Sequence, residues 1–244
     1  PEYIVDLVNQ GAISETRIDE SVRRILRNKF DLGLFETPFA DEAKVNALVN
    51  LPEYVSLGMT AQRNAVVLLD NESITLPLAA ETRIFVDGLD PSVAAKYGTV
   101  VETPDEADVV LLFLNTVFNG NQPAGTDRTL DQMMASRFPD TNLAFSEEIL
   151  AKAASYSDVS QLVTLVDLNR PAVLTELNGM SDALVGTFGV SDEAMLDVVF
   201  GKHNPVGKLP FELPSSMAEV EAQLEDVPDD TANPLFPYGW GLSY

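Results

Sequence analysis

The sequence contains no cysteine and only one histidine, and these two absences exclude several kinds of site. Without cysteine the chain has no disulfide framework, no thiolate metal site and no cysteine nucleophile. A histidine-based zinc site needs several ligands, so His203 alone does not predict a metal centre. A serine–histidine–aspartate triad would need His203 as its base. His203 stands in the turn-like segment 201–205, so we expect a solvated turn residue instead.

Basic residues are also scarce. The 15 Lys and Arg stand against 38 Asp and Glu, which gives a formal net charge of −23. This balance argues against nucleic-acid binding, which needs a basic surface, and against docking on anionic membranes. No apolar run reaches the roughly 18 residues that a membrane-spanning helix needs. We interpret the charge as a solubility or salt-tolerance trait of the surface. It is concentrated in residues 212–231, which contain seven acidic residues and no basic one.

The first 35 residues have the periodicity of two helices. The first helix is expected over residues 3–8 and stops at Gly11, and Ser14 or Thr16 offers the N-cap of the second. Along the second helix one face is apolar and the opposite face is basic: Ile18, Val22, Ile25, Leu26 and Phe30 against Arg17, Arg23, Arg24, Arg27 and Lys29. The basic face suits either open solvent, which we favour, or an acidic partner.

A change of pattern separates this part from the rest of the chain. Residues 36–54 hold Pro38, Pro52 and several charges, which is typical of a linker. A helix is expected from about Val55 to Val67, followed by the segment 68–71.

From residue 82 onward, short apolar runs alternate with helical segments. Strands are predicted at 83–86, 109–114, 162–166 and 183–188, and helices at 91–97, 147–157, 171–178 and 192–200. Runs that are apolar on both faces and separated by helices suit a mostly parallel sheet covered by helices. The sequence therefore predicts a layered α/β domain. The apolar, aromatic segment 234–244 is expected to pack on a surface.

Two segments that follow predicted strands are candidate sites, because ligands of open α/β sheets bind beyond the carboxyl ends of strands. Segment 115–145 contains Asn119–Arg128, whose Asn, Gln, Asp and Arg side chains suit sugar hydroxyls. The same composition also suits a polar surface loop. Segment 189–194 offers backbone N–H groups to an anion, although an ordinary capped helix start is the interpretation we favour. None of the common nucleotide-binding, zinc-protease or serine-hydrolase motifs is present.

Four motifs in one order point to a known family. They are GAISETRIDESVRRILRNKFDLGLFE (11–36), AQRNAVVLLDN (61–71) with LPL (76–78), FG (200–201) with NPVGKLPF (204–211), and PLFPYGWGLSY (234–244). Together these segments resemble the C-terminal portion of glycoside hydrolase family 3, and they cover nearly the whole chain. The resemblance implies a layered α/β/α sandwich with a mostly parallel sheet, preceded by helices left from the end of a (β/α)₈ barrel.

The resemblance also implies a division of the chain and an activity. Residues 1–35 would be terminal helices of the barrel domain, 36–60 a linker, 61–214 the α/β sandwich domain, and 215–244 an acidic segment with an aromatic tail. Family members are retaining β-glycosidases that act on β-glucosides and β-xylosides through two carboxylates and a covalent glycosyl intermediate. Their nucleophile is an Asp of the N-terminal barrel, so this barrel is the expected partner, beside the carbohydrate substrate. No cofactor and no metal are expected.

The acid/base residue is where this sequence departs from the family. Many members place a Glu on a loop of the sandwich domain, but no Glu occurs between Glu106 and Glu147, and Asn115 stands where some members have it. Among the acids of the loop we choose Asp127 as a substrate contact or acid/base, and Asp131 as a weaker candidate. Arg128 favours the ionised carboxylate of Asp127, which suits a contact better than a general acid. Asn115 and Arg128 are predicted to bind substrate.

Two interpretations of the whole chain stay open. In the first, it is the C-terminal part of a working exo-acting β-glycosidase, incomplete and inactive by itself. In the second, it is a non-catalytic accessory or sugar-binding scaffold module that has lost the acid/base. The sequence as given starts at Pro1 and shows no signal peptide, so we expect either a processed protein or a piece of a longer one. A secreted or periplasmic location is favoured slightly over the cytoplasm.

Overall fold

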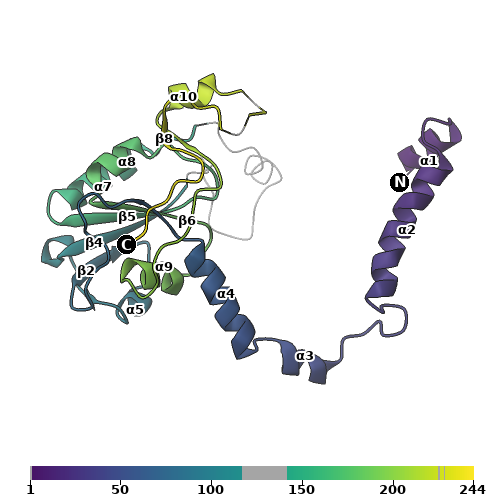
Figure 1. Cartoon of the computed structure of the whole chain (residues 1–244), viewed down its shortest axis with the longest axis horizontal. Helices are drawn as coiled ribbons and strands as arrows, with labels where there is room; N and C mark the ends of the chain where they lie inside the picture. The colour runs from purple at the N-terminus through teal and green to yellow at the C-terminus, as the bar shows by residue number, and fades with distance from the viewer. Residues whose placement is uncertain (1, 117–141, 225, 228) are drawn as a thin grey trace. The chain divides into compact units, whose positions relative to one another are not determined.

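The computed structural model describes residues 2–116, 142–224, 226–227 and 229–244 (Figure 1). The chain divides into two units, residues 1–55 and 56–244, which are described separately below. Among the described residues, no helix combines the length and the apolar character that crossing a bilayer requires.

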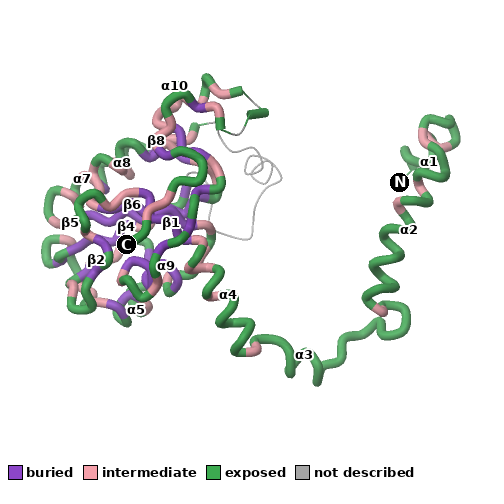
Figure 2. The backbone as a smooth tube through the Cα atoms, viewed as in Figure 1, coloured by how far each residue is buried: buried purple, intermediate pink, exposed green. Residues whose placement is uncertain are grey.

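The first unit consists of helices. These are α1 (Glu2–Asn9), α2 (Glu15–Asp31) and α3 (Glu42–Leu48), and α4 (Pro52–Asn64) continues into the second unit. Ser14 caps α2 by accepting a hydrogen bond from the backbone N–H of Arg17, so the N-cap is Ser14 and not Thr16. The apolar face of α2 is exposed, with Ile25 at 58% and Phe30 at 59%. Figure 2 shows these helices in green, the colour of exposed residues.

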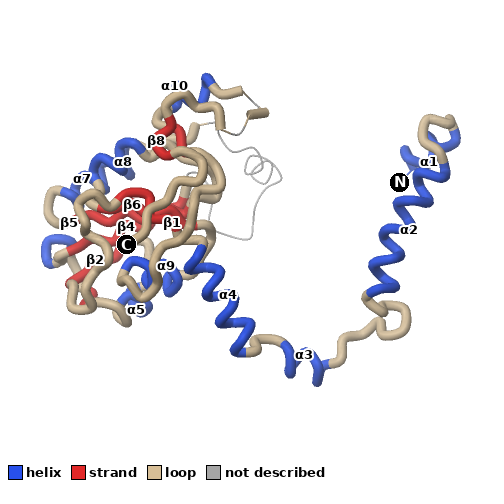
Figure 3. The backbone as a smooth tube through the Cα atoms, in the orientation of Figure 1, coloured by secondary structure: helices blue, strands red, loops and turns tan. Residues whose placement is uncertain are grey.

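The second unit is built on a six-stranded sheet in the order β1-β6-β5-β4-β2-β3. The strands are β1 (Val67–Asp70), β2 (Arg83–Asp87), β3 (Thr99–Val100), β4 (Val109–Asn115), β5 (Gln161–Asp167) and β6 (Ala183–Thr187). All neighbours are parallel except β1, which pairs antiparallel with β6. The predicted mostly parallel sheet is confirmed, and Figure 3 shows its strands in red.

Helices cover both faces of this sheet. The second unit contains α5 (Pro91–Ala94), the 3₁₀ turn η1 (Pro104–Glu106), α7 (Glu147–Ser157), α8 (Thr175–Met180), α9 (Asp192–Val199) and α10 (Met217–Ala222). One core layer joins Ile84 and Leu165 to Met195 of α9, and the other joins Leu162 to Ala153 of α7 and Leu177 of α8. The buried residues in Figure 2 are concentrated along the strands. The layered α/β/α sandwich is therefore confirmed.

One element expected from the sequence is wrong. The helix expected over Val55–Val67 ends at Asn64, and residues 67–70 form β1. Val66, Val67, Leu68 and Leu69 are all at most 1% exposed, so this run is buried on both faces. A strand that lies between two helix layers buries consecutive side chains in this way.

Three polar side chains at the end of α4, all within the second unit, bind this end of the helix to the rest of that unit. Gln62 accepts from the backbone N–H of Ser191 at 2.8 Å, and Arg63 binds Asp197 of α9. The Oδ1 of Asn64 lies 2.9 Å from Nε2 of His203, so that ring nitrogen is the donor. His203 is thus the turn residue that the sequence predicts, although it is half-buried against α4 and not freely solvated.

The C-terminal segment packs along β1, as expected of an apolar tail. Leu242 donates its backbone N–H to Leu68 at 2.8 Å, and the indole of Trp240 donates to the carbonyl oxygen of Leu69 at 2.8 Å. Upstream, β8 (Pro234–Phe236) pairs with β7 (Leu213–Pro214). The edge of the chain's own sheet therefore holds the backbone of this tail, although several of its aromatic side chains remain exposed.

Candidate functional site

Three parallel strands end side by side in polar residues. In the registers of the sheet, Asn115 of β4 lies beside Asp167 of β5, and Asp167 beside Thr187 of β6. Residues in register on parallel strands point to the same face of the sheet. The sheet therefore brings these three side chains together at its carboxyl edge. Asn115, the predicted substrate contact at this edge, is exposed there.

Asp167 is the buried centre of the edge, with only 6% of its surface exposed. One carboxylate oxygen accepts from the Thr187 hydroxyl at 3.2 Å and from the Gly189 backbone N–H at 2.6 Å. The other oxygen accepts from the side-chain amide of Asn169 at 2.8 Å. Asp167 thus links the segment after β5 to the segment after β6.

Sequence reasoning missed this carboxylate. Asp167 follows the apolar run 162–166 directly, and a polar residue at the end of a buried strand was the available signal. What the sequence did not show is that donors from β6 and from the loop after β5 converge on it.

Thr116 adds an unpaired hydroxyl to the same edge. Its backbone N–H donates to the carbonyl oxygen of Asp167 at 3.1 Å, which fixes it beside β5. The residue is 3% exposed, and its Oγ1 has no hydrogen-bond partner among the residues that the structure describes. A buried hydroxyl without a partner costs about 1–3 kcal/mol, so its persistence at a polar edge favours a role in binding.

Between β2 and β4, where the strand order reverses, side chains of α7 bind the residue at the end of β2. Asp87 at the end of β2 accepts from Lys152 at 3.0 Å and from the Tyr156 hydroxyl at 2.9 Å, both from α7. Burial, followed by the hydrogen bond to Asp87, raises the pKa of Tyr156 to about 12. This arrangement favours a structural role for Asp87, although ligands of open α/β sheets often bind at such a switch point.

The remaining predicted site residues, Asp127, Arg128 and Asp131, lie outside the described residues. The described chain on both sides of that segment lies near the ends of β4 and β5. Before it, Thr116 binds Asp167. After it, the carbonyl oxygen of Asn142 accepts from Arg170, and that of Leu143 from Val173.

The segment after β6 behaves as a capped helix start. Gly189 donates its N–H to Asp167 and Ser191 donates its N–H to Gln62, while the Ser191 hydroxyl caps α9 through Ala194. These N–H groups are therefore committed to the protein itself, which confirms the interpretation favoured from the sequence over an anion site. Within the residues that the structure describes, no three histidine, aspartate or glutamate side chains gather closely enough to hold a metal ion.

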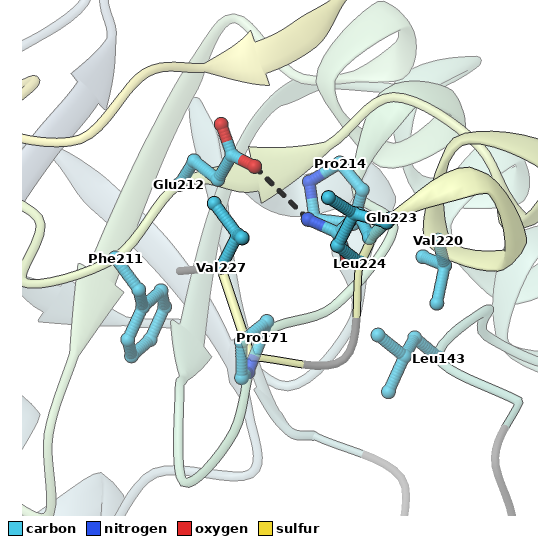
Figure 4. Close-up of a pocket in the computed structure, with 9 residues that line it drawn as sticks. All are labelled: Leu143, Pro171, Phe211, Glu212, Pro214, Val220, Gln223, Leu224 and Val227. Carbon is cyan, nitrogen blue, oxygen red and sulfur yellow. Dashed lines mark hydrogen bonds between the residues drawn. The ribbon is translucent and has the colours of Figure 1, made fainter. Parts of the chain in front are cut away.

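A pocket of about 300 Å³ lies beside β7 (Figure 4). Its lining residues are Leu143, Pro171, Phe211, Glu212, Pro214, Val220, Gln223, Leu224 and Val227. Glu212 is 5% exposed and accepts from Gln223 at 2.9 Å and from the Thr231 N–H at 2.8 Å. The carboxylate of Glu212 therefore holds the acidic segment after α10 against the domain, and its role is structural.

Comparison with known proteins identifies the family of this fold. Residues 93–244 match the model of the glycosyl hydrolase family 3 C-terminal domain. The whole chain is 44% identical to beta-glucosidase C of Emericella nidulans, over 39% of that protein. It is 37% identical to the periplasmic beta-glucosidase/beta-xylosidase of Dickeya chrysanthemi, with 99% of this chain and 36% of that protein covered. The chain thus spans less than half the length of these two relatives.

Solved structures agree on the fold. A crystal structure of beta-glucosidase from Listeria innocua, in complex with isofagomine, superposes with a TM-score of 0.72 at 23% identity. The match covers 99% of this chain and 41% of the other. The four sequence motifs, the parallel sheet and the family model agree, and the chain belongs to glycoside hydrolase family 3, of which it represents the C-terminal portion.

Proposed function

We propose that this chain is the C-terminal part of a retaining, exo-acting β-glycosidase that hydrolyses terminal β-glucosyl or β-xylosyl residues. The observation that carries the proposal is the match of the entire chain to the C-terminal portions of proteins named beta-glucosidase and beta-glucosidase/beta-xylosidase. In this proposal the chain supplies one wall of the active site to an N-terminal barrel that carries the Asp nucleophile. By itself it is incomplete and inactive.

The polar carboxyl edge supports this role. Asn115, Thr116 and Asn169 present neutral hydrogen-bonding groups near the end of β4 and β5. A glucoside or xyloside is neutral and rich in hydroxyls, so neutral donors and acceptors suit it. A polysaccharide-facing wall of this kind needs no basic surface, which agrees with the net charge of −23.

The chemistry needs a nucleophile and an acid/base. We assign the nucleophile to the barrel, and we propose Asp127 as substrate contact or acid/base, with Asp131 as a weaker candidate. Asn115 and Arg128 are proposed to bind the sugar. If neither Asp protonates the leaving group, the acid comes from outside this chain.

The test is an assay of the full-length protein that contains this chain. Wild type is expected to hydrolyse aryl β-glucosides or β-xylosides, and NMR of the first-formed sugar is expected to show the β-anomer, which marks retention. An inactive full-length protein, or an α-anomer product, would overturn the proposal.

The substitution Asp127→Asn separates the two roles of Asp127. Loss of a general acid slows cleavage about 10²–10⁴-fold. This decrease in rate is smaller for leaving groups of low pKa, because they need no protonation. Loss of a contact lowers kcat/KM about five- to tenfold for every leaving group. Full activity of Asp127→Asn would refute both roles, and Asp131→Asn would then be tested in the same way. The control for both variants is Asp158→Asn, at the C-terminal end of α7.

One observation favours the second function, a non-catalytic accessory module. The sequence has no Glu between Glu106 and Glu147, where many family members carry their acid/base. Intact-mass measurement on a native preparation distinguishes the two functions. A barrel in the same polypeptide, or co-purifying with it, supports the enzyme, whereas a chain that purifies without any barrel supports the accessory module.

A further inference from the structure

The orientation of the Asn169 side chain is determined by its buried neighbour. Its amide nitrogen lies 2.8 Å from a carboxylate oxygen of Asp167. A carboxylate only accepts hydrogen bonds, so the NH₂ group must face Asp167 and the amide oxygen must face away. The other groups on this carboxylate, the Thr187 hydroxyl and the Gly189 N–H, are also donors. Asn169 itself is exposed, so its oxygen is presented to solvent as an acceptor of known orientation.

The segment that carries Asn169 is held in place before any ligand arrives. Asp167 is 6% exposed, and its backbone is part of β5. Leu168 continues the strand by donating its N–H to the carbonyl oxygen of Thr187 at 2.7 Å. An acceptor that is fixed in advance loses little conformational entropy on binding, which is the advantage of a preorganised contact.

The neighbouring groups complete a neutral binding edge. Asn115 lies in register with Asp167 and is exposed, and Thr116 keeps a buried hydroxyl that has no partner within the described part of the chain. The only charge among these groups, Asp167, is buried under three donors. What reaches solvent are the neutral amides of Asn115 and Asn169, whose donors and acceptors suit sugar hydroxyls and not ions.

We propose that Asn169 binds substrate through its amide oxygen, which accepts a hydrogen bond from one hydroxyl of the sugar, and that Asp167 is the positioning residue that holds this oxygen outward. The inference rests on the proposed glycosidase function and extends it to two residues of the carboxyl edge. If the inference is right, the contribution of Asn169 to kcat/KM depends on the presence of one particular hydroxyl of the substrate.

The experiment measures kcat/KM of the full-length enzyme with an aryl β-glucoside and with its 2-, 3-, 4- and 6-deoxy analogues. Asn169→Ala is expected to lower kcat/KM of the parent glucoside about five- to tenfold, the range for one lost hydrogen bond. For one analogue, which lacks the partner hydroxyl, the same substitution is expected to change nothing. Such coupling between one residue and one hydroxyl does not arise from a general loss of structure.

Asp167→Asn tests the positioning role. The new amide keeps an oxygen for Thr187 and Gly189, but it turns its NH₂ toward Asn169. Asn169 then has to rotate its own oxygen inward and present NH₂ to the substrate. The expected result is loss of coupling to the same hydroxyl that Asn169→Ala identifies, with a melting temperature close to that of wild type.

Asn233→Ala is the matched control. Asn233 also donates its amide to a carboxylate, that of Glu219 at 3.0 Å, but in the segment between α10 and β8. It should leave kcat/KM of all five substrates unchanged. An active wild type in which Asn169→Ala changes nothing, or slows all five substrates equally, would overturn this inference alone. A wild type that hydrolyses none of the glycosides would overturn the proposed function, and this inference with it.

Discussion

Arg63 of α4 and Asp197 of α9 form the most buried ion pair among the residues that the structure describes. Nε of Arg63 lies 2.6 Å from Oδ2 of Asp197, and Nη2 lies 2.5 Å from the same oxygen. The other oxygen of Asp197 accepts from the Tyr97 hydroxyl at 2.7 Å. Burial, followed by the bond to Asp197, raises the pKa of Tyr97. A helix that precedes the sheet is thus anchored to its core through charge.

Removing one member of this pair should destabilise the second unit. The side chain of Asp197 is 7% exposed and that of Arg63 27%. Arg63→Ala leaves a carboxylate buried with only the tyrosine as a side-chain partner. We expect the free energy of unfolding to fall by about 3 kcal/mol, the lower end of the range for breaking a buried pair, because Arg63 still reaches solvent. This decrease can be measured by urea unfolding, followed by the fluorescence of Trp240, the single tryptophan.

The control for this prediction is the exposed pair Arg83–Asp108, which has a similar distance of 2.6 Å. Its side chains are 55% and 48% exposed, so water screens the attraction. Arg83→Ala should shift the urea midpoint much less than Arg63→Ala does. Equal shifts for the two variants would refute the idea that burial makes the Arg63 pair important.

The C-terminal tail offers a test of close backbone packing. A Cβ built on Gly241 would lie well inside the van der Waals radius of the Gly207 carbonyl oxygen, a backbone atom that cannot rotate away. Gly241→Ala should therefore separate the tail from β1 and lower the melting temperature by several degrees. Gly179→Ala, in helix α8 with open space at its Cβ, should be neutral or slightly stabilising. Calorimetry on both variants checks the contrast, and a similar melting temperature for both would contradict it.

The strands that sequence reasoning found share one property. The runs at 109–114 and 162–166 are buried on both faces, so a continuous apolar stretch was a sufficient signal. Strand β1 was missed because its apolar residues continue the helix before it without a break. Its pairing with β6 and its contact with Leu242 are formed by residues more than 100 positions away. Such contacts leave no local pattern in the sequence.

The position after a strand was not sufficient to predict the candidate site. Asn115 was found because it follows a predicted strand and stands where some members of the family have a Glu, and the structure places it at the carboxyl edge. Asp167 and Asn169 have the appearance of an ordinary polar turn, and only the convergence of Thr187 and Gly189 distinguishes them. The family resemblance depended on local motifs, which is why it was accurate although the tertiary contacts were unknown.

Tyr156 predicts how stability depends on alkaline pH. Its pKa is raised from 10 to about 12, chiefly by burial and then by the bond to Asp87. Since the folded state holds this proton more tightly, its stabilising effect is complete below pH 10 and is lost as the pH rises through about 12. Tyr156→Phe should therefore reduce the fall in unfolding free energy between pH 9 and 11.5, measured by urea titration. An unchanged pH dependence would show that Tyr156 contributes nothing to it.

The exposed apolar face of α2 predicts self-association of the isolated chain. Val22, Ile25 and Phe30 are 45%, 58% and 59% exposed, and apolar stripes of this kind usually mark an interface. The net charge of −23 opposes association, so we expect it to strengthen as added salt screens the charge. Light scattering should show oligomers of the wild-type chain and a smaller species for the double variant Ile25→Glu/Phe30→Glu. Arg24→Glu, which also adds negative charge but on the basic face, separates loss of the apolar stripe from simple repulsion. If the wild-type chain is a monodisperse monomer at high salt, the apolar face of α2 does not by itself cause association.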